Sequence, residues 1–357
     1  MSKYPCLSIN LKVIESNTRH LIQQCQERGV DPVGITKLAC GAPEVARAMI
    51  AGGISIIGDS RIENLKKQKN IPIKKMLLRL PAISEAREVV RYADISLNSE
   101  QNTLQALSDM AVEENKIHEI IIMHDLGDLR EGCFNKEDTF QLARKVLSLP
   151  GLKLTGIGSN LACYGGVEPT NKNQNDLIHI AEDIEKDLNI NFSVISGASS
   201  SALFLLAAGE LPARINQLRL GASLIMGIGL NDDPIPETSQ QAIKLQVEVI
   251  EIKEKPSVPV NSTALDAFGN KPVFIDRGNR KRAICAIGKQ DIDISEITPD
   301  DEDIIIIGGS SDHLILDISD SKEPYNVGDI ISFSLSYGGV LQCMTSEFVH
   351  KNYIDNN

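Results

Sequence analysis

Short apolar runs alternate with amphipathic segments from residue 33 to about residue 230. The apolar runs predict buried strands, and the segments between them, with apolar residues at helical spacing, predict helices. The predicted strands are residues 33–38, 54–57, 76–80, 93–97, 119–124, 152–158, 191–195 and 217–220. The predicted helices include residues 43–51, 84–91, 100–114, 136–149 and 171–187. This alternation is typical of an α/β fold and favours a (β/α)8 TIM barrel, although a doubly wound open sheet alternates in the same way.

The pattern changes at both ends of this region. Residues 6–11 predict a strand and residues 14–26 a helix, and we expect residues 1–12 to pair with a second domain. The polar, proline-containing stretch 230–238 predicts a linker. Beyond it, helical periodicity gives way to short β runs at residues 247–252, 273–275, 282–287, 304–307, 314–318, 330–335 and 340–345. The sequence therefore predicts a barrel over residues 1–232 and a C-terminal, mostly antiparallel β domain over residues 233–357.

Composition narrows the class of protein. The formal net charge of -12 over 357 residues leaves no basic surface to neutralise phosphates, so no nucleic-acid partner is expected. No apolar run approaches the length of a membrane span, and the N-terminus lacks the apolar core of a signal peptide. The cysteines are scattered without a C-x-x-C pair, which is typical of reduced thiols in the cytoplasm and predicts no cysteine metal site.

The first predicted barrel strand ends on Lys37, after the apolar run Val-Gly-Ile-Thr. A lysine at this position lies at the face where barrel enzymes carry out their chemistry. If it is partly desolvated, its amine can form a Schiff base with a carbonyl group. The structural alternative is a lysine that extends from a strand end into solvent, and this stretch alone leaves both open.

Small residues follow the last two predicted barrel strands. Ser199, Ser200 and Ser201 precede a predicted helix, and Gly221 and Ala222 follow the eighth strand. Small residues let the backbone approach a phosphate, and barrels frequently bind phosphate with these two loops. A serine N-cap and a tight turn would have the same composition. The occurrence of such loops in both places favours a phosphate.

Arg219 ends the eighth strand, which is adjacent to the first strand and Lys37 in a closed barrel. Its alternatives are to reach the barrel mouth or to form a surface salt bridge. A Schiff-base lysine, phosphate-binding loops and an arginine for a ring nitrogen are together the requirements of pyridoxal 5'-phosphate (PLP). Two further candidates are Arg130, which could bind a substrate carboxylate, and Asn160 after the sixth strand. In the second domain, the loop 308–313 combines hydroxyl, carboxylate and imidazole groups, although such loops are also structural.

These motifs resemble the alanine racemase family, the fold-type III PLP enzymes, over nearly the whole chain. The likeness is greatest to the ornithine racemase-type branch, and its motifs lie at residues 36–37, 125–132, 156–163, 267–269, 287–291 and 310–313. The resemblance implies that Lys37 forms the Schiff base and that Arg219 contacts the pyridine nitrogen. It also implies phosphate-binding positions at Ser200, Gly221 and Ala222.

The resemblance extends to the substrate and the partner subunit. It places Arg130 near the substrate carboxylate. It implies a homodimer in which each β domain completes the active site of the other subunit, and in which Ser311 and Asp312 belong to the loop offered to the substrate. Two departures affect this picture: Met123 replaces a carbamylated lysine that supports the arginine, and Asn160 replaces a histidine beside the cofactor ring.

Two further departures concern the phosphate and the second base. Gly41 replaces a phosphate-binding tyrosine, and Phe268, in the motif 267–269, stands near the expected catalytic tyrosine of the partner subunit. Because phenylalanine cannot transfer a proton, alanine is not the expected substrate. We predict that His313 or Asp312 acts opposite Lys37, with Tyr337 and Tyr164 as reserve candidates.

The predicted function is racemisation of an amino acid with PLP, by removal and return of the Cα proton. A basic substrate such as ornithine follows from the branch resemblance, and its side-chain ammonium could meet Asp128, Glu131 or Asp266. Arg219 favours a racemase over a decarboxylase, in which a carboxylate is expected at the ring nitrogen. The alternatives are an amino-acid decarboxylase, an alanine racemase, a D-amino-acid aldolase or a non-catalytic PLP-binding protein. The β domain argues against the last, because such carriers resemble the barrel alone.

Overall fold

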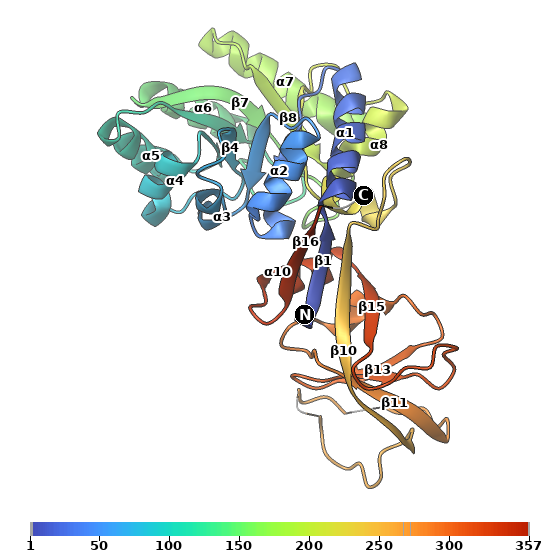
Figure 1. Ribbon diagram of the computed structural model, residues 1–357. Coiled ribbons are helices and arrows are strands. Elements are labelled where there is room, and N and C mark those ends of the chain that lie inside the picture. Colours follow the sequence, from blue (N-terminus) through green and yellow to red (C-terminus); the bar gives the residue numbers. More distant parts are fainter. Residues whose placement is uncertain (1–2, 267, 272, 356–357) are drawn as a thin grey trace. The chain divides into compact units, whose positions relative to one another are not determined.

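The computed structural model describes residues 3–266, 268–271 and 273–355 (Figure 1). The chain divides into two compact units. One is Leu11–Gln240, and the other combines Met1–Asn10 with Gln241–Asn357. Each unit is described by itself below.

The first unit contains a closed barrel of parallel strands. Its strands, in the order in which they pair around the barrel, are β2 (Val33–Ile35), β3 (Ile56–Asp59), β4 (Lys74–Leu77), β5 (Ile95–Asn98), β6 (His118–Met123), β7 (Leu152–Gly158), β8 (Val194–Ser199) and β9 (Gln217–Leu220). Pairing of β2 with β9, in which Val33 lies opposite Arg219, closes the ring. The predicted TIM barrel is confirmed, and the closure excludes the open sheet.

Helices connect the strands on the outside of the barrel (Figure 1). They are α1 (Leu11–Glu27), α2 (Pro43–Ala51), α3 (Ile62–Lys67), α4 (Ala86–Tyr92), α5 (Gln101–Glu113), α6 (Lys136–Ser148), α7 (Asn171–Leu188), α8 (Leu203–Ala208) and α9 (Ala222–Met226). Short 3-10 turns are η1 (Lys37–Ala39), η2 (Ile83–Glu85), η3 (Ser200–Ala202) and η4 (Leu230–Asp232). Among the helices of the described residues, none has both the length and the apolar character needed to cross a membrane.

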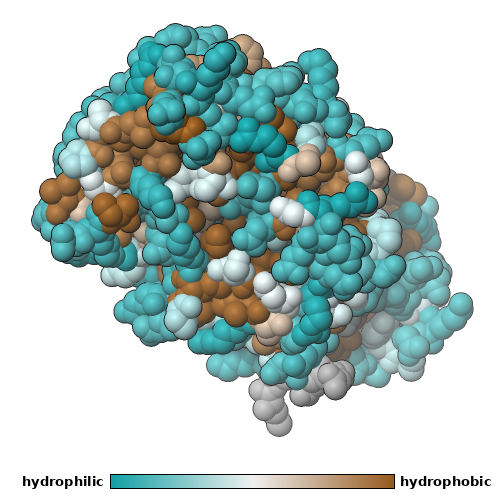
Figure 2. Space-filling model, turned by 90° about the horizontal axis from the view of Figure 1, so that it is seen from above, coloured by the Kyte–Doolittle hydropathy of each residue, from teal (hydrophilic) through white to brown (hydrophobic). Residues whose placement is uncertain are grey.

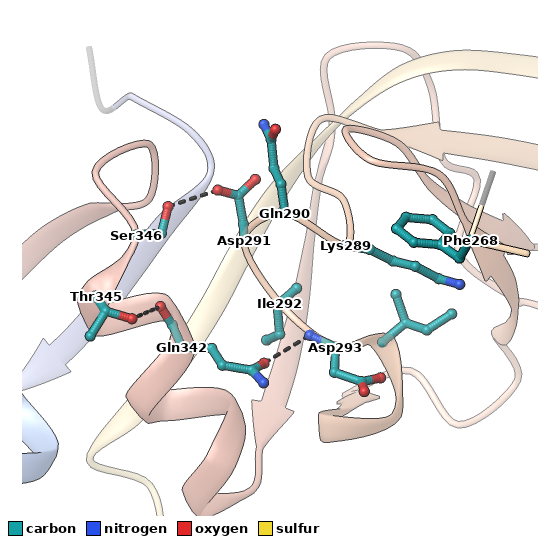
Figure 3. A pocket seen from close by; sticks show the side chains of 10 residues that line it. Phe268, Lys289, Gln290, Asp291, Ile292, Asp293, Gln342, Thr345 and Ser346 are labelled. Carbon is teal, nitrogen blue, oxygen red and sulfur yellow. Dashed lines mark hydrogen bonds between the residues drawn. The ribbon is translucent and has the colours of Figure 1, made fainter.

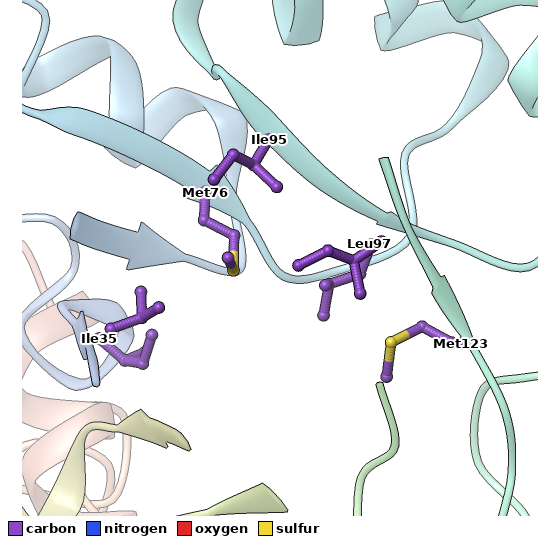
Figure 4. Packing of buried hydrophobic residues seen from close by; sticks show 7 residues of the cluster. Ile35, Met76, Ile95, Leu97 and Met123 are labelled. Carbon is purple, nitrogen blue, oxygen red and sulfur yellow. The ribbon is translucent and has the colours of Figure 1, made fainter. Parts of the chain in front are cut away.

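Apolar side chains fill the barrel interior. One cluster of buried residues, shown in Figure 4, consists of Val33, Ile35, Met76, Ile95, Leu97, Ile121 and Met123. Successive members on one strand are two residues apart, as expected where alternate side chains of a strand face inward. Because the interior is packed, polar side chains that could act on a ligand have to come from the strand ends and the loops beyond them.

The second unit is built on a mostly antiparallel sheet, as predicted. Its strands are β1 (Cys6–Asn10), β10 (Ile243–Pro256), β11 (Asn279–Cys285), β12 (Ile297–Pro299), β13 (Ile305–Gly309), β14 (Leu314–Asp317), β15 (Ile330–Leu335) and β16 (His350–Ile354), with the short turn η5 (Ile294–Glu296). The order β12-β15-β10-β11-β14-β13 is antiparallel, and β1 pairs antiparallel with β10 but parallel with β16. The N-terminal strand is thus an integral part of this sheet.

Two predicted strands of this unit are wrong. The run 340–345 forms most of helix α10 (Tyr337–Thr345), which begins where the Ser336 hydroxyl accepts a hydrogen bond from the Gly339 N–H. Its buried residues recur at helical spacing, but the apolar run is too short for this spacing to be distinguished from that of a strand. Residues 273–275 lie in irregular structure, and Val273 is 89% exposed, because no neighbouring strand pairs with this run. Apolar composition alone does not make a strand without a partner.

Candidate active site

Lys37 lies at the C-terminal end of β2, and its side chain is exposed. The predicted strand 33–38 ends early, at Ile35, and Lys37 begins the turn η1. The residue before it, Thr36, is fully buried, donates a hydrogen bond from its hydroxyl to Oδ2 of Asp59 at 2.8 Å and accepts one from Gln68 at 3.0 Å. The hydrogen bonds of Thr36 therefore fix the backbone next to Lys37, while the Lys37 side chain is exposed at the C-terminal end of the strand.

Arg219 is the most heavily buried cation of the site, with 4% of its surface exposed. Its Nη2 donates to the Ser159 carbonyl and to Oδ1 of Asn160, both at 2.6 Å, and its Nη1 donates to the hydroxyl and carbonyl of Ser196. Within the described residues the Nε–H has no acceptor. Burial lowers the pKa of Arg219 to about 10, so the group remains a cation at neutral pH. One donor of a fixed guanidinium is left for a ligand.

The predicted phosphate loops meet at Ser200. Its buried hydroxyl lies 2.9 Å from Oγ of Ser223 and accepts hydrogen bonds from the backbone N–H groups of Gly221, at 3.2 Å, and Ser223, at 3.3 Å. Ser199 and Ser201 contact each other through their hydroxyl groups, 3.1 Å apart.

Gly221 shows why this backbone needs a small residue. A Cβ there would lie 3.2 Å from Cβ of Ile35, so Ile35 would have to shift by a few tenths of an ångström. Gly221 and Ala222 are both partly exposed, whereas Ser223 is buried. The residues after β8 and β9 thus gather hydroxyl and N–H donors in one place, which suits an anion.

Arg130 and Asn160 both bind Glu131, a residue that the sequence suggested only as a partner for the side-chain ammonium of a substrate. The Arg130 guanidinium pairs with both carboxylate oxygens of Glu131, with 2.7 Å from Nη2 to Oε1, and Asn160 donates to the same carboxylate from Nδ2. The hydrogen bond to Glu131 is the main cause that raises the pKa of Arg130. Because Oδ1 of Asn160 accepts from Arg219, Glu131 and Asn160 connect the two arginines.

Asp128 has a structural position. It is 1% exposed, and its carboxylate accepts backbone N–H groups of the loop after β7, from Cys163, Tyr164, Gly165 and Val167 at 2.9–3.3 Å. These four contacts occupy the carboxylate that we considered for a substrate ammonium. Tyr164, the reserve candidate in this loop, is 76% exposed.

The predicted residues of the second unit lie together in one loop. His313 Nδ1 is 2.8 Å from Oδ1 of Asp312, and this hydrogen bond is the main cause that lowers the pKa of Asp312. The Ser310 hydroxyl donates to the same Asp312 oxygen at 3.2 Å. Ser311 is exposed, and its carbonyl accepts the Gln290 N–H at 3.0 Å. These hydrogen bonds hold the loop 310–313 against residues 288–290. The motifs 287–291 and 310–313 therefore lie side by side.

A pocket of about 650 Å³ in this unit is lined by residues 289–294 together with Phe268, Gln342, Thr345 and Ser346 (Figure 3). Lys289 places its ammonium 4.4 Å from the centre of the Phe268 ring, a cation–π contact. Asp291 accepts a hydrogen bond from Ser346, and Gln342 accepts one from the Asp293 N–H. Ala267 of the predicted motif lies outside the described residues. Tyr337, the other reserve candidate, begins α10 in this unit.

The structure brings the barrel candidates together through polar residues that the sequence did not single out. Ser159, Ser196 and Ser223 share hydrogen bonds with the predicted residues. Ser159 and Ser223 lie just beyond the ends of β7 and β9, and Ser196 lies within β8. Serine is common in such positions, so the sequence contains no signal that singles them out. The assigned roles of Lys37 and its neighbours stay predictions.

Known proteins match this chain over almost its whole length. Residues 9–228 match the family model described as "Alanine racemase, N-terminal domain". An ornithine racemase of Acetoanaerobium sticklandii is 42% identical over 98% of this chain and 100% of its own length. A lysine racemase of Thermotoga maritima is 41% identical over 98% of both chains.

Solved structures share the fold at lower identity. An alanine racemase of Clostridium difficile 630 has a TM-score of 0.76 at 18% identity, covering 99% of this chain and 96% of its own. A D-threonine aldolase of Filomicrobium marinum has a TM-score of 0.71 at 13% identity, covering 96% and 89%. At these identities the likeness describes the architecture and says nothing about the substrate.

Proposed function

We propose that this chain, which belongs to the alanine racemase family, uses PLP to interconvert the L and D forms of a basic amino acid such as ornithine or lysine. The predicted family and the predicted racemase class are confirmed by the family model and by the two racemases that match almost the entire chain. The observation that carries the substrate proposal is that both relatives above 40% identity are named for diamino acids. The chain is an amino-acid racemase of this family.

The barrel mouth offers groups that fit PLP. The unassigned Nε–H of the buried Arg219 can donate to a ring nitrogen, and the donors around Ser200 and Gly221 suit a phosphate. Lys37 supplies an exposed amine at the end of the strand adjacent to β9. When bound, PLP would stabilise the negative charge left at Cα after proton removal. These contacts support the cofactor proposal.

The residues of the chain account for the remaining needs of racemisation. Arg130 would bind the α-carboxylate and fix which bonds of Cα face the bases. The Nζ amine of Lys37 would remove or return the Cα proton on one face. Arg219 stays protonated and donates, so that it would keep a ring nitrogen as an acceptor rather than a protonated group.

The opposite face requires a second base, which we assign to His313 or Asp312 of a second subunit. The imidazole and carboxylate are hydrogen-bonded to each other and remain partly exposed, at 43% and 64% of their side chains. Exposed apolar residues flank Arg130 on its own loop: Leu129 is 64% exposed and Phe134 63%. Figure 2 shows a largely hydrophilic face that is interrupted by apolar patches. A homodimer would cover such a surface and bring the second base to the site.

One assay tests the function. The PLP-loaded protein is incubated with single L-amino acids in deuterated water, and Cα exchange, chirality and CO2 release are followed. Exchange with loss of chirality on ornithine or lysine supports the proposal, whereas CO2 release would assign a decarboxylase. In a parallel incubation with a D-β-hydroxy amino acid, release of an aldehyde by retro-aldol cleavage would assign an aldolase. Absence of exchange with every amino acid would assign a non-catalytic PLP protein. Sedimentation of a fully active monomer would contradict the homodimer.

A further inference from the structure

We propose that Glu131 is a positioning residue of the active site, which orients Arg130 toward the α-carboxylate of the amino acid and couples it through Asn160 to Arg219. The inference rests on the proposed function, because it names a group that orients the substrate of that reaction. It starts from the placement of one carboxylate between two arginines, and it assigns to Glu131 a role different from binding a side-chain ammonium.

Glu131 meets Arg130 along one edge of the guanidinium. Nε donates to Oε2, and Nη2 donates to Oε1 at 2.7 Å. A guanidinium presents two such edges to carboxylates, and this pair uses the Nε–Nη2 edge, which leaves the N–H groups of Nη1 and the second N–H of Nη2 for another carboxylate. Glu131 is 15% exposed and Arg130 41%, so an anchored carboxylate holds a guanidinium whose outer end reaches solvent. That outer end has the geometry to bind a second carboxylate.

Asn160 transmits the arrangement to Arg219. Its Nδ2 donates to Oε1 of Glu131, and its Oδ1 accepts from Nη2 of Arg219 at 2.6 Å. An amide has one donor end and one acceptor end, so the anion on one side and the cation on the other allow one orientation of the Asn160 side chain. Donors and acceptors therefore alternate without interruption from Arg130 to Arg219.

The carboxylate also separates two positive charges. Burial is the main cause that lowers the pKa of Arg219, Arg130 lowers it further and Glu131 opposes the decrease. Met123, at the inner end of the same segment, is fully buried in the apolar barrel core and supplies no anion. Without Glu131, the guanidinium of Arg130 would lose its local counter-ion and be free to change rotamer.

The other carboxylates of the segment 125–132 are committed elsewhere. Asp125 accepts the backbone N–H groups of Gly127 and Leu129, at 2.8 and 3.2 Å. Asp128 accepts those of the loop after β7. Among the described residues, Glu131 is thus the carboxylate of this segment that binds side chains of the site, whereas Asp125 and Asp128 bind the backbone of the loops.

The test compares two ligands that differ by the α-carboxylate, L-ornithine and putrescine. Equilibrium binding to the PLP-loaded protein is measured for wild type, E131Q, E131A and E131D. We expect E131Q and E131A to weaken ornithine binding by about tenfold or more, the equivalent of one charged hydrogen bond, and to leave putrescine binding nearly unchanged. E131D keeps the charge and should retain part of the preference. In kinetics, KM for ornithine should rise more than kcat falls.

Glu185 provides a matched control. It forms a two-oxygen pair with Arg214, with side-chain exposures of 12% and 41%, close to those of Glu131 and Arg130. This pair lies near the end of α7 and before β9, at the opposite end of the strands from the barrel mouth. E185Q should leave the preference for ornithine over putrescine unchanged.

Two results would overturn the assignment. One is an unchanged ratio of ornithine to putrescine affinity in both E131Q and E131A. The other is an equal loss for both ligands, which would show a general structural role. Wild-type racemisation of ornithine is measured in the same preparation. Its absence would contradict the proposed function, while the affinity ratio still reports on Glu131.

Discussion

The hydroxyl of Thr36, the residue before Lys37, donates a hydrogen bond of 2.8 Å to the carboxylate of Asp59, and both Thr36 and Asp59 are fully buried. Asp59 also accepts from Nδ2 of Asn64 and from the Arg61 N–H, each at 3.0 Å. Burial is the main cause that raises the pKa of Asp59, and these donors oppose the increase. The strand end that presents Lys37 therefore depends on a polar network inside an otherwise apolar region.

This network predicts a stability difference between two substitutions of Thr36. T36V removes a donor to Asp59 and an acceptor for Gln68, so it should lower the free energy of unfolding by about 1–3 kcal/mol. T36S retains the hydroxyl and should lose less. Urea unfolding of the two variants measures the difference. Equal stability of T36V and T36S would show that the hydroxyl contributes nothing there.

Lys37 should carry the cofactor. Borohydride reduction of the PLP-loaded protein, followed by peptide mass mapping, should place the pyridoxyl group on Lys37, and K37A should abolish the label. Lys67 is the control amine, since it binds the Cys40 carbonyl at 2.8 Å, and Cys40 ends the turn that Lys37 begins. K67A should label like wild type. A pyridoxyl group on another lysine of the wild type would refute the assignment.

Arg219 should not tolerate lysine. Arg219 donates to four acceptor atoms from two nitrogens, whereas a lysine ammonium has three donors on one nitrogen. R219K therefore leaves buried acceptors unsatisfied and should lower the free energy of unfolding by about 1–3 kcal/mol. Racemase activity should fall as well. R214K at the exposed pair with Glu185 should cost less than about 1 kcal/mol. Calorimetric unfolding and initial rates measure both effects, and equal losses in the two variants would argue against a special role of the buried network.

Stability should depend on pH through His118. This side chain is 1% exposed, its Nε2 lies 2.7 Å from the Ser96 hydroxyl, and burial lowers its pKa to about 4. Between that value and the ordinary pKa of 6.5, the unfolded chain binds a proton that the folded chain does not. The contribution of His118 is therefore fully present above pH 6.5 and is lost as the pH falls toward 4.

The variant H118Q isolates this effect from other titrating groups. Unfolding free energies of wild type and H118Q are measured between pH 4 and 7. The wild type should lose more stability than H118Q as the pH falls. Parallel curves would show that His118 is not the group responsible.

The second base is tested by H313A and D312A. The two groups are hydrogen-bonded at 2.8 Å, so removal of either should alter the protonation of the other. If they act opposite Lys37, racemisation should fall in at least one variant by about 100-fold, the scale of general acid–base catalysis. S319A is a control, because Ser319 binds the backbone of Lys281 in the same unit, away from this loop. An unchanged rate in both H313A and D312A would exclude the pair.

The pattern of apolar residues was sufficient to predict a helix or strand where that pattern depends on the one element alone. Periodicity predicted β7 and β9 with their correct bounds and α2 likewise. The same reasoning failed at α10, because a short apolar run fits a strand and a buried helix equally well. The N-cap that marks the start of this helix, Ser336, lies before the apolar run. It also failed at residues 273–275. A strand there would need a neighbouring strand to pair with, and the assembly of the whole sheet decides whether one is present.

For the site, the sequence by itself determined which chemical groups stand at strand ends: the amine of Lys37, the guanidinium of Arg219 and the small residues after β8 and β9. Position along a βα unit decides this, since parallel strands all end at the same face. Only the tertiary structure decided how these groups are joined. Glu131 and Asn160 link Arg130 to Arg219, and Asp59 supports Lys37 through Thr36, because hydrogen bonds between different strands depend on distances that no single stretch of sequence contains.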